Sequence, residues 1–312
     1  MSQLLKLEEL SSLDYKNLDR YKTLFLVNLS PIENHGSHLP LGIDLYESAA
    51  VIKGISERFK IDYPDWTIVI CPDLTLGLGT MLGQGSINIR QRVLRDFLID
   101  YLSSFAKRGF KHILLSGYHG EIRHCSTIDE AVSYVNKKYN SKIVSPFGYY
   151  VSNILSKKIE MKDPELNKIY KSNVGDIHGG MIETSFMLHI NKDLVGEYKN
   201  LKRINILEKN FFKKIVALKD SYKSGYFGNP AVASPEIGEM VLKESVDNFY
   251  YVLDKSIKEP DFIHEVKSLG YKKVYLRTDF FRYISFFLLL FSGLLLLKNK
   301  STNSSLKNEI NR

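Results

Sequence analysis

Short apolar runs alternate with longer amphipathic segments through the first half of the chain. Four runs rich in Leu, Ile and Val, bounded by Ser, Pro or Gly, are typical of buried strands; they span residues 23–30, 66–72, 112–117 and 141–147. Between them, apolar residues recur at helical spacing in three segments, from Leu45 to Phe59, from Val93 to Phe105 and from Ile128 to Val135. This alternation predicts parallel strands joined by crossover helices.

The predicted fold class is therefore α/β, a three-layer αβα arrangement in which helices cover both faces of a mostly parallel sheet. We find no internal repeat, low-complexity segment or second domain, and expect one domain over residues 1–268. A short charged neck follows at 269–279, then an apolar segment at 280–297 and a polar, basic tail at 298–312.

The apolar segment is the one part of the chain that suggests a membrane. Residues 283–297 carry no charge, but as a helix they reach only ~22 Å, against a hydrocarbon core of ~30 Å. Including Phe280, Phe281 and Arg282, whose charged end can extend to the head groups, gives ~27 Å. We expect a single C-terminal transmembrane anchor at 280–297. A buried hairpin helix or an oligomer-interface helix is the alternative, because so apolar a run needs a non-aqueous surrounding in either case.

Nothing at the start of the chain has the cationic and apolar pattern of an export signal, so we expect the large domain to stay in the cytoplasm. Lys and Arg are about as frequent before the apolar segment as after it, so the positive-inside rule does not give the orientation.

The net charge of +8 does not indicate a nucleic-acid partner. The last fifteen residues hold +3 of it and Arg282 another +1, and no basic run interleaved with aromatic residues precedes residue 270. The two cysteines, Cys71 and Cys125, are too few for a disulfide framework and form no CxxC motif, which fits a reducing compartment.

Acidic and histidine side chains follow two of the predicted strands. Glu33 and His35 come after the first, and His119 and Glu121 after the third. Each pair is two residues apart, so an extended backbone sends both members to the same side, and ligands of such sheets bind beyond the carboxyl ends of the strands. Asp44 follows the loop "HLPLGI", which can return the chain over the same place. We expect the five side chains to share one pocket.

Two imidazoles and three carboxylates suit Zn, Mn or Fe better than Ca or Mg, because His is not a ligand of all-oxygen cages. Five ligands exceed the three of an open catalytic zinc site and fit two metals with a bridging carboxylate. Taken singly, any of these residues is more often a capping or solvated residue than a ligand. The case for a metal site depends on the two pairs together.

Four ordered motifs resemble the creatininase (creatinine amidohydrolase) family. They are "PIENHGSHLPLGIDL", "GQGSINIRQRVLRDFL", "DIHGGMIETSFML" and "SGYFGNPAVASPEIGEMVL", and the resemblance covers about residues 23–254 but not the apolar segment. It implies a metal-dependent amidohydrolase with two divalent ions per chain, Zn in the first place and Mn or Fe as alternatives. The substrate would be a cyclic amide, a formamide or a peptide, and the chain would assemble as a hexamer.

By motif, the resemblance places one metal on Glu33, Asp44 and His119 and the other on His35, Asp44 and Glu121, so that Asp44 bridges them. Water activated by the two metals would attack the amide carbon.

Further roles follow from the remaining motifs. His178 is implied as the residue that protonates the leaving nitrogen, and its ordinary pKa near neutrality suits this role. Glu183 would support the site from outside the ligand set or, equally, stabilise a helix N-terminus. His38 fits the loop pattern as a supporting residue rather than a ligand. For His124 we expect a solvated surface position rather than one at the pocket mouth.

The chain departs from the family pattern at two places. Where the family has Asn-Gly-His, this chain reads Ser116-Gly117-Tyr118-His119, one residue longer, so Tyr118 is an alternative occupant of the histidine position. Creatinine-hydrolysing members close their pocket with tryptophans after the third strand, whereas the only tryptophan here, Trp66, precedes it. Creatinine is therefore not the expected substrate. The competing reading of the chain is a non-catalytic, membrane-tethered relative with a scaffold or regulatory role.

Overall fold

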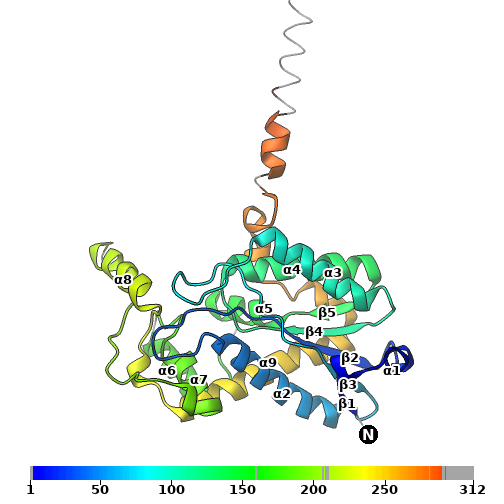
Figure 1. The fold of residues 1–312 in the computed structure, drawn as a ribbon, viewed down its shortest axis with the longest axis horizontal. Helices are drawn as coiled ribbons and strands as arrows, with labels where there is room; N and C mark the ends of the chain where they lie inside the picture. Colours follow the sequence, from blue (N-terminus) through cyan, green and yellow to red (C-terminus); the bar gives the residue numbers. More distant parts are fainter. Residues whose placement is uncertain are drawn as a thin grey trace, which may run out of the picture.

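The computed structural model describes residues 3–158, 160–173, 175–205, 207, 211–280, 282–289 and 292. At its centre is a five-stranded, wholly parallel sheet of strand order β1-β3-β2-β4-β5 (Figure 1). The strands are β1 (Gln3–Lys6), β2 (Thr23–Asn28), β3 (Thr67–Ile70), β4 (His112–Ser116) and β5 (Lys142–Val144). The four predicted strands are present. The edge strand β1 was not predicted, because its four residues are mostly exposed and form no apolar run.

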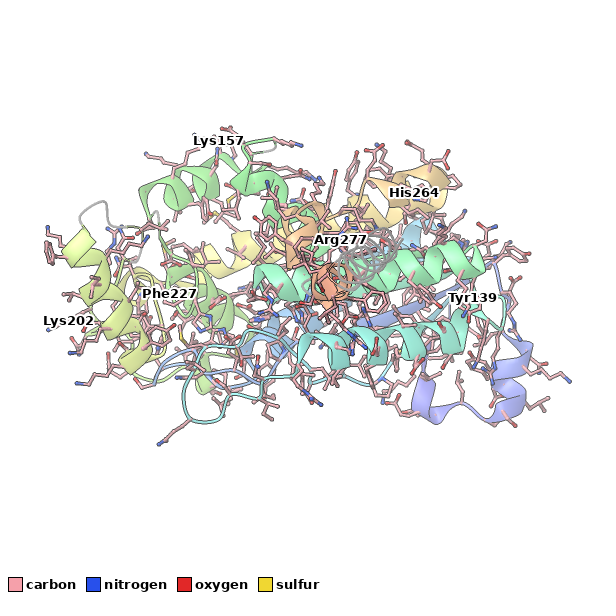
Figure 2. All side chains as sticks on the ribbon, turned by 90° about the horizontal axis from the view of Figure 1, so that it is seen from above. Tyr139, Lys157, Lys202, Phe227, His264 and Arg277 are labelled. Carbon is pink, nitrogen blue, oxygen red and sulfur yellow. The ribbon has the colours of Figure 1, made fainter. Side chains whose placement is uncertain are left out.

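Helices cover both faces of this sheet, as the sequence predicts. On one face lie α3 (Gln91–Ala106) and α4 (Ile122–Tyr139), which run side by side in Figure 2. The other face is covered chiefly by α2 (Ile43–Asp62), α5 (Pro146–Leu155), α7 (Met181–Asn191) and α9 (Pro235–Lys258). Alternation along β2 divides the core, because Phe25 and Val27 pack with α3 and α4 while Leu24 and Leu26 pack with α2 and α9.

Shorter elements complete the described chain. They are α1 (Ser12–Asn17), α6 (Pro164–Ser172), α8 (Phe211–Ser224), α10 (Leu269–Lys272) and the 3-10 turns η1 (Leu7–Glu9), η2 (Lys192–Leu194), η3 (Pro230–Val232), η4 (Pro260–His264) and η5 (Val274–Leu276).

The direction in which successive strands are added to the sheet changes between β2 and β4. From β2 it crosses through α2 to β3 on one side, and from β4 it crosses through α4 to β5 on the other side and over the opposite face. The loops that leave the carboxyl ends of two such adjacent strands separate and leave a crevice, where ligands bind in sheets of this kind. Both predicted acid and histidine pairs follow these two strands.

The segment predicted as a charged neck, 269–279, is held against α3 and α4. The backbone N–H of Ser268 donates to Asp129 Oδ2 at 2.7 Å, and that of Thr278 to Glu130 Oε1 at 2.7 Å. Asp279 pairs with Arg95 at 3.0 Å, and Figure 2 shows Arg277 over the helical layer. Backbone amides of this part of the chain and the carboxylate of Asp279 therefore dock the segment on charged residues of α3 and α4.

Residues 282–289 form a helix that projects from the body of the protein (Figure 1). Within the described residues, no helix is both long enough and apolar enough to cross a membrane. The anchor predicted at 280–297 lies partly outside the described residues, and the tail predicted at 298–312 lies wholly outside them. The anchor stays a prediction.

Close packing of α7 against α9 generates a test of the fold. A Cβ on Gly238 would lie 2.0 Å from the backbone oxygen of Ser185. Alanine normally stabilises a helix interior by ~0.5–1 kcal/mol relative to glycine, but here it would have to push two helices apart. We therefore expect Gly238→Ala to lower the free energy of unfolding by ~1–3 kcal/mol, measured by chemical denaturation. Glu239→Ala, on the exposed side of α9, is the control and should change it by less than ~0.5 kcal/mol. A stabilised Gly238→Ala protein would contradict this packing.

Candidate metal centre

The loop after β2 brings the first ligand candidates into the crevice. Glu33 and His35 are 2% and 1% exposed, and the backbone N–H of Glu33 donates to Leu41 O at 2.8 Å, which folds the loop back on itself. The chain then enters α2, whose first turn holds Asp44, 1% exposed. The return of the chain predicted from "HLPLGI" is thus present, and a carboxylate in the first turn of a helix is a favourable position.

Two groups of possible ligands share Asp44. Glu33, Asp44 and His119 form one, and His35, Asp44 and Glu183 form the other, with one donor atom of every member within 4.8 Å of those of the rest. In the first group, His119 Nδ1 lies 2.9 Å from Glu33 Oε2 and 3.6 Å from Asp44 Oδ2. In the second, His35 Nε2 lies 3.2 Å from Asp44 Oδ1 and 3.6 Å from Glu183 Oε2.

Both imidazoles are oriented by a carbonyl on their far side. His119 Nε2 lies 2.9 Å from Leu78 O, and His35 Nδ1 lies 3.2 Å from Glu33 O. A carbonyl only accepts, so these ring nitrogens carry the protons and donate them. In the neutral rings the other nitrogens then direct lone pairs at the carboxylates. Histidines that bind metals have this arrangement: one ring nitrogen binds the metal, and the N–H of the other donates to a carbonyl or a carboxylate.

The carboxylate oxygens that face these lone pairs lack donors. Glu33 Oε2 and both oxygens of Asp44 are buried without a hydrogen-bond partner in the described part of the chain. The 2.9 Å approach of His119 to Glu33 is therefore short but not directed as a hydrogen bond is. Buried carboxylates without donors are costly unless a cation or a proton neutralises them. The residues present therefore fit a metal centre.

Electrostatics point the same way. Burial lowers the pKa of His35, but the Asp44 and Glu183 carboxylates outweigh it and raise that pKa to about 10. Burial also lowers the pKa of His119, but Glu33 outweighs it and raises that pKa to about 9. Burial raises the pKa of Glu33, whereas its pairing with His119 brings it down to about 2. The cluster thus attracts positive charge, which divalent ions supply with release of the protons.

Glu121, predicted as a ligand, lies outside both groups. It is the N-cap of α4, and its Oε2 accepts from the backbone N–H of His124 at 2.6 Å. The expectation assumed an extended backbone after β4, whereas the helix starts directly after Glu121 and its free amides attract the carboxylate. Glu183, expected outside the ligand set, belongs to one of the groups that could hold a metal ion. It also accepts from the backbone N–H of Gly179 at 2.5 Å, in the first turn of α7.

His178 lies beside the second group. Its ring stacks on that of His35 with centroids 4.0 Å apart, and its Nε2 lies 2.8 Å from Asn34 O. Because the carbonyl accepts, Nδ1 is the ring atom left to take up a proton. Burial and the neighbouring His35 lower the pKa of His178 to about 4, so it is neutral in this setting. His178 thus lies beside the candidate ligands, and with Glu33 and His35 it forms a further group that could hold a metal ion.

Asp176 holds the loop that carries His178. Its Oδ2 accepts from the backbone N–H of Met181 at 2.7 Å and of Asn229 at 2.9 Å, and its Oδ1 from that of Ile182 at 3.1 Å. A Cβ on Gly180 would lie 2.4 Å from Asp176 Oδ2, so the loop closes tightly around this carboxylate.

His38 joins two loops of the site. Its Nε2 lies 3.0 Å from Gly179 O and 3.0 Å from Thr184 Oγ1. Burial lowers the pKa of His38 to about 4. The neutral ring donates to the carbonyl and so links the loop after β2 to the start of α7.

Sequence reasoning missed Glu47, one turn after Asp44 on α2. Its side chain is fully buried, and neither carboxylate oxygen has a hydrogen-bond partner among the described residues. Burial, with the nearby charges of Glu183 and Asp44, raises the pKa of Glu47 well above its ordinary value. The sequence did contain a signal for Glu47. It is an acidic residue three positions after Asp44, on a face of the helix that is otherwise turned to the core.

Two other expectations are corrected. His124 is 1% exposed rather than solvated, and its ring contacts that of His119 edge to face with centroids 4.9 Å apart. Tyr118 does not occupy the histidine position. Its ring lies among Phe147, Phe186 and Phe249, and its hydroxyl is 2.6 Å from Ser245 Oγ. The extra residue of the Ser-Gly-Tyr-His loop therefore turns into the core.

The sequence model of the creatininase family, described as creatinine amidohydrolase, matches residues 8–253. A relative, the mycofactocin precursor peptide peptidase of Mycolicibacterium smegmatis, is 24% identical over 228 residues, which cover 72% of this chain and 81% of that protein.

Two solved structures share the fold. One, described as creatininase Mn, aligns with a TM-score of 0.58 at 18% identity over 82% of this chain and 99% of that one. The other, a mutant creatininase described as the Zn-Zn type, has a TM-score of 0.58 at 18% identity over 81% of this chain and 98% of that one.

The exchange of Glu121 for Glu183 in the ligand groups can be tested by metal counting. After loading with Zn and removal of the excess, we expect about two ions per unmodified chain, about one in Glu183→Gln and about two in Glu121→Gln, because only Glu183 has a donor atom in a ligand group. Elemental analysis gives the counts. Glu121→Gln should instead lower stability by ~1 kcal/mol through the weakened helix cap. Loss of one ion from Glu121→Gln with both retained in Glu183→Gln would reverse the assignment.

Proposed function

The chain belongs to the creatininase family of metal-dependent amidohydrolases, and we propose that it hydrolyses a C–N amide bond at a centre of two divalent metal ions. Glu33, Asp44 and His119 would hold one ion and His35, Asp44 and Glu183 the other. The observation that carries the proposal is the pair of ligand groups that share Asp44, whose two oxygens are buried without donors. Zn and Mn fit the mixed nitrogen and oxygen donors best, with Fe as a further alternative.

When bound, the metal ions would polarise the amide carbonyl and acidify a water molecule. The other steps fall to side chains of this chain. His178 is neutral, and with Nε2–H donated to Asn34 its Nδ1 is free to take up a proton and pass it to the leaving nitrogen. His38 and Asp176 hold the loop that carries His178, and Glu47 would keep its proton, adding no negative charge beside the ligands.

We propose a peptide or another amide, rather than creatinine, as the substrate. The peptidase relative supports a peptide. Trp66, the only tryptophan of the sequence, packs against Phe59, Tyr63 and His112 at the amino-terminal end of β4, so it lies away from the crevice at the carboxyl ends. The tryptophans that close the creatinine pocket would then have no counterpart here. The intact ligand groups give no support to the alternative of a non-catalytic scaffold.

We further propose that the C-terminal segment anchors the protein in a membrane, with the catalytic domain in the cytoplasm and assembled as an oligomer. The helix at 282–289 supports the anchor, because Phe286, Phe287 and Leu289 are 57%, 66% and 71% exposed. Large apolar side chains that lie together in water usually mark a contact with lipid or protein. Several anchors on one oligomer would strengthen binding to a single membrane.

Activity is tested with the metal-loaded full chain on formamides, cyclic amides and short peptides, by detection of the released amine. Asp44→Asn should abolish hydrolysis and metal binding at both positions, because this residue belongs to both ligand groups. His178→Gln should keep the metals and lower kcat by ~10²–10⁴-fold, as expected for loss of a general acid or base. Absence of hydrolysis in all three substrate classes, with two metals bound, would refute the amidohydrolase proposal.

The anchor is tested by cell fractionation. The full chain should sediment with membranes and resist a high-salt wash, and a chain ending at Phe280 should be released. Two lysines placed at Phe287 and Leu289 in the full-length chain should also release it, because each costs ~2.5–3.5 kcal/mol in the centre of a membrane helix. Equal membrane association of all three proteins would refute the anchor.

A further inference from the structure

His124, which the proposed chemistry does not use, is connected to the candidate centre by the backbone of one residue. The N–H of Leu78 donates to His124 Nδ1 at 3.3 Å, and the carbonyl of Leu78 accepts from His119 Nε2 at 2.9 Å. An amide N–H only donates, so His124 Nδ1 must carry a lone pair and its proton must lie on Nε2. Both polar groups of Leu78 are thus used by the two histidines.

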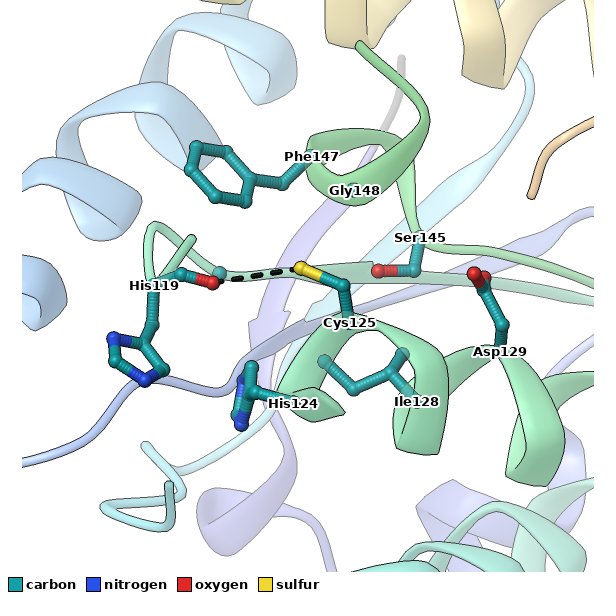
Figure 3. Close-up of a pocket in the computed structure, with 9 residues that line it drawn as sticks. His119, His124, Cys125, Ile128, Asp129, Ser145, Phe147 and Gly148 are labelled. Atoms are coloured by element: carbon teal, nitrogen blue, oxygen red, sulfur yellow. Dashed lines mark hydrogen bonds between the residues drawn. The ribbon is translucent and has the colours of Figure 1, made fainter. Parts of the chain in front are cut away.

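The two imidazoles also touch directly. Their centroids are 4.9 Å apart at an angle of 75°, and Figure 3 shows them adjacent at the start of α4. His119 is held from its other end as well, because its backbone oxygen accepts from Cys125 Sγ at 3.6 Å. Besides its contacts with Glu33 and Asp44, His119 is therefore held by contacts from α4 and from Leu78.

Leu78 itself has little freedom to move. A Cβ on Gly77 would lie 2.4 Å from Pro31 Cβ, and one on Gly79 would lie 2.4 Å from Glu121 Cγ. Beyond it, the N–H of Gly79 donates to Asn88 Oδ1 at 2.6 Å. The segment is enclosed on both sides, so the hydrogen bond to His124 fixes a carbonyl that is already confined.

We propose that His124 is a positioning residue for one of the two metal positions: through Leu78 it fixes the ring and the proton of His119, so that His119 Nδ1 faces Glu33 and Asp44. This inference rests on the proposed metal centre. It predicts an asymmetry between the two positions, because His35 is oriented by the carbonyl of Glu33 and has no such support from α4.

Paired substitutions separate this role from simple filling of space. His124→Leu retains most of the buried volume but removes the acceptor. His124→Asn loses volume but places Oδ1 where Nδ1 was, and so can still accept from Leu78. A positioning role predicts that Asn replaces His better than Leu does, whereas a packing role predicts the opposite order.

Each metal position can be measured alone in the full chain after a substitution removes the other position. Glu183→Gln leaves the position of Glu33, Asp44 and His119, and Glu33→Gln leaves that of His35, Asp44 and Glu183. Zn affinity is then measured by competition with a chelator, with thermal unfolding of the metal-free proteins as a check on folding. This readout does not depend on turnover.

In the Glu183→Gln background we expect His124→Leu to weaken Zn binding by about 10–100-fold, the usual effect of removing a residue that orients a ligand, and His124→Asn to stay within about threefold of His124. In the Glu33→Gln background neither should change the affinity by more than about twofold. Unchanged affinity in His124→Leu, equal losses in Leu and Asn, or equal losses in both backgrounds would overturn the role of His124. An unmodified chain without stoichiometric Zn would instead overturn the metal centre itself.

Discussion

The arrangement of the candidate site depends on one electrostatic constraint, which is that carboxylates are buried together with two imidazoles and their oxygens have too few hydrogen-bond donors. Glu33 and Asp44 are almost completely buried, and the carbonyls behind His119 and His35 turn the ring nitrogens toward them. Such a cluster is stable only with positive charge inside it, as protons or as metal ions. The same constraint makes tightly held loops necessary, because a small displacement would separate the buried carboxylates from the positive charge that neutralises them.

Hydrogen bonds fix the loops around the cluster. Glu33 Oε1 accepts from the backbone N–H of Met81, in the glycine-rich segment after β3. His38 ties the loop after β2 to the start of α7, and Asp176 closes the loop that carries His178. Gly79, with φ near +73°, provides the backbone conformation that lets this segment approach Glu121. Preorganisation of this kind would position the proposed ligands and His178 without reorganisation during a reaction.

Glu121 and Glu183 show how the start of a helix affects the position of an acidic side chain. Both carboxylates lie at the amino-terminal end of a helix, where free amides attract them. At α4 the carboxylate folds back on His124 and is used as a cap, whereas at α7 it accepts from Gly179 and still reaches His35. The difference lies in which backbone amides and side chains surround each carboxylate, and the spacing of residues along the chain does not predict this.

Local pattern was enough for the strands, the helices on both faces and the position of the crevice, because burial on one or two faces imposes a period on the sequence. It was also enough to predict that Glu33, His35, Asp44 and His119 lie together, since each follows a strand end or a short loop. Tertiary structure alone decided the place of Glu183, the burial of Glu47 and His124, and the turn of Tyr118 into the core. Those outcomes depend on contacts between segments far apart in the sequence, such as Leu78 with His124. A local sequence pattern does not predict such contacts.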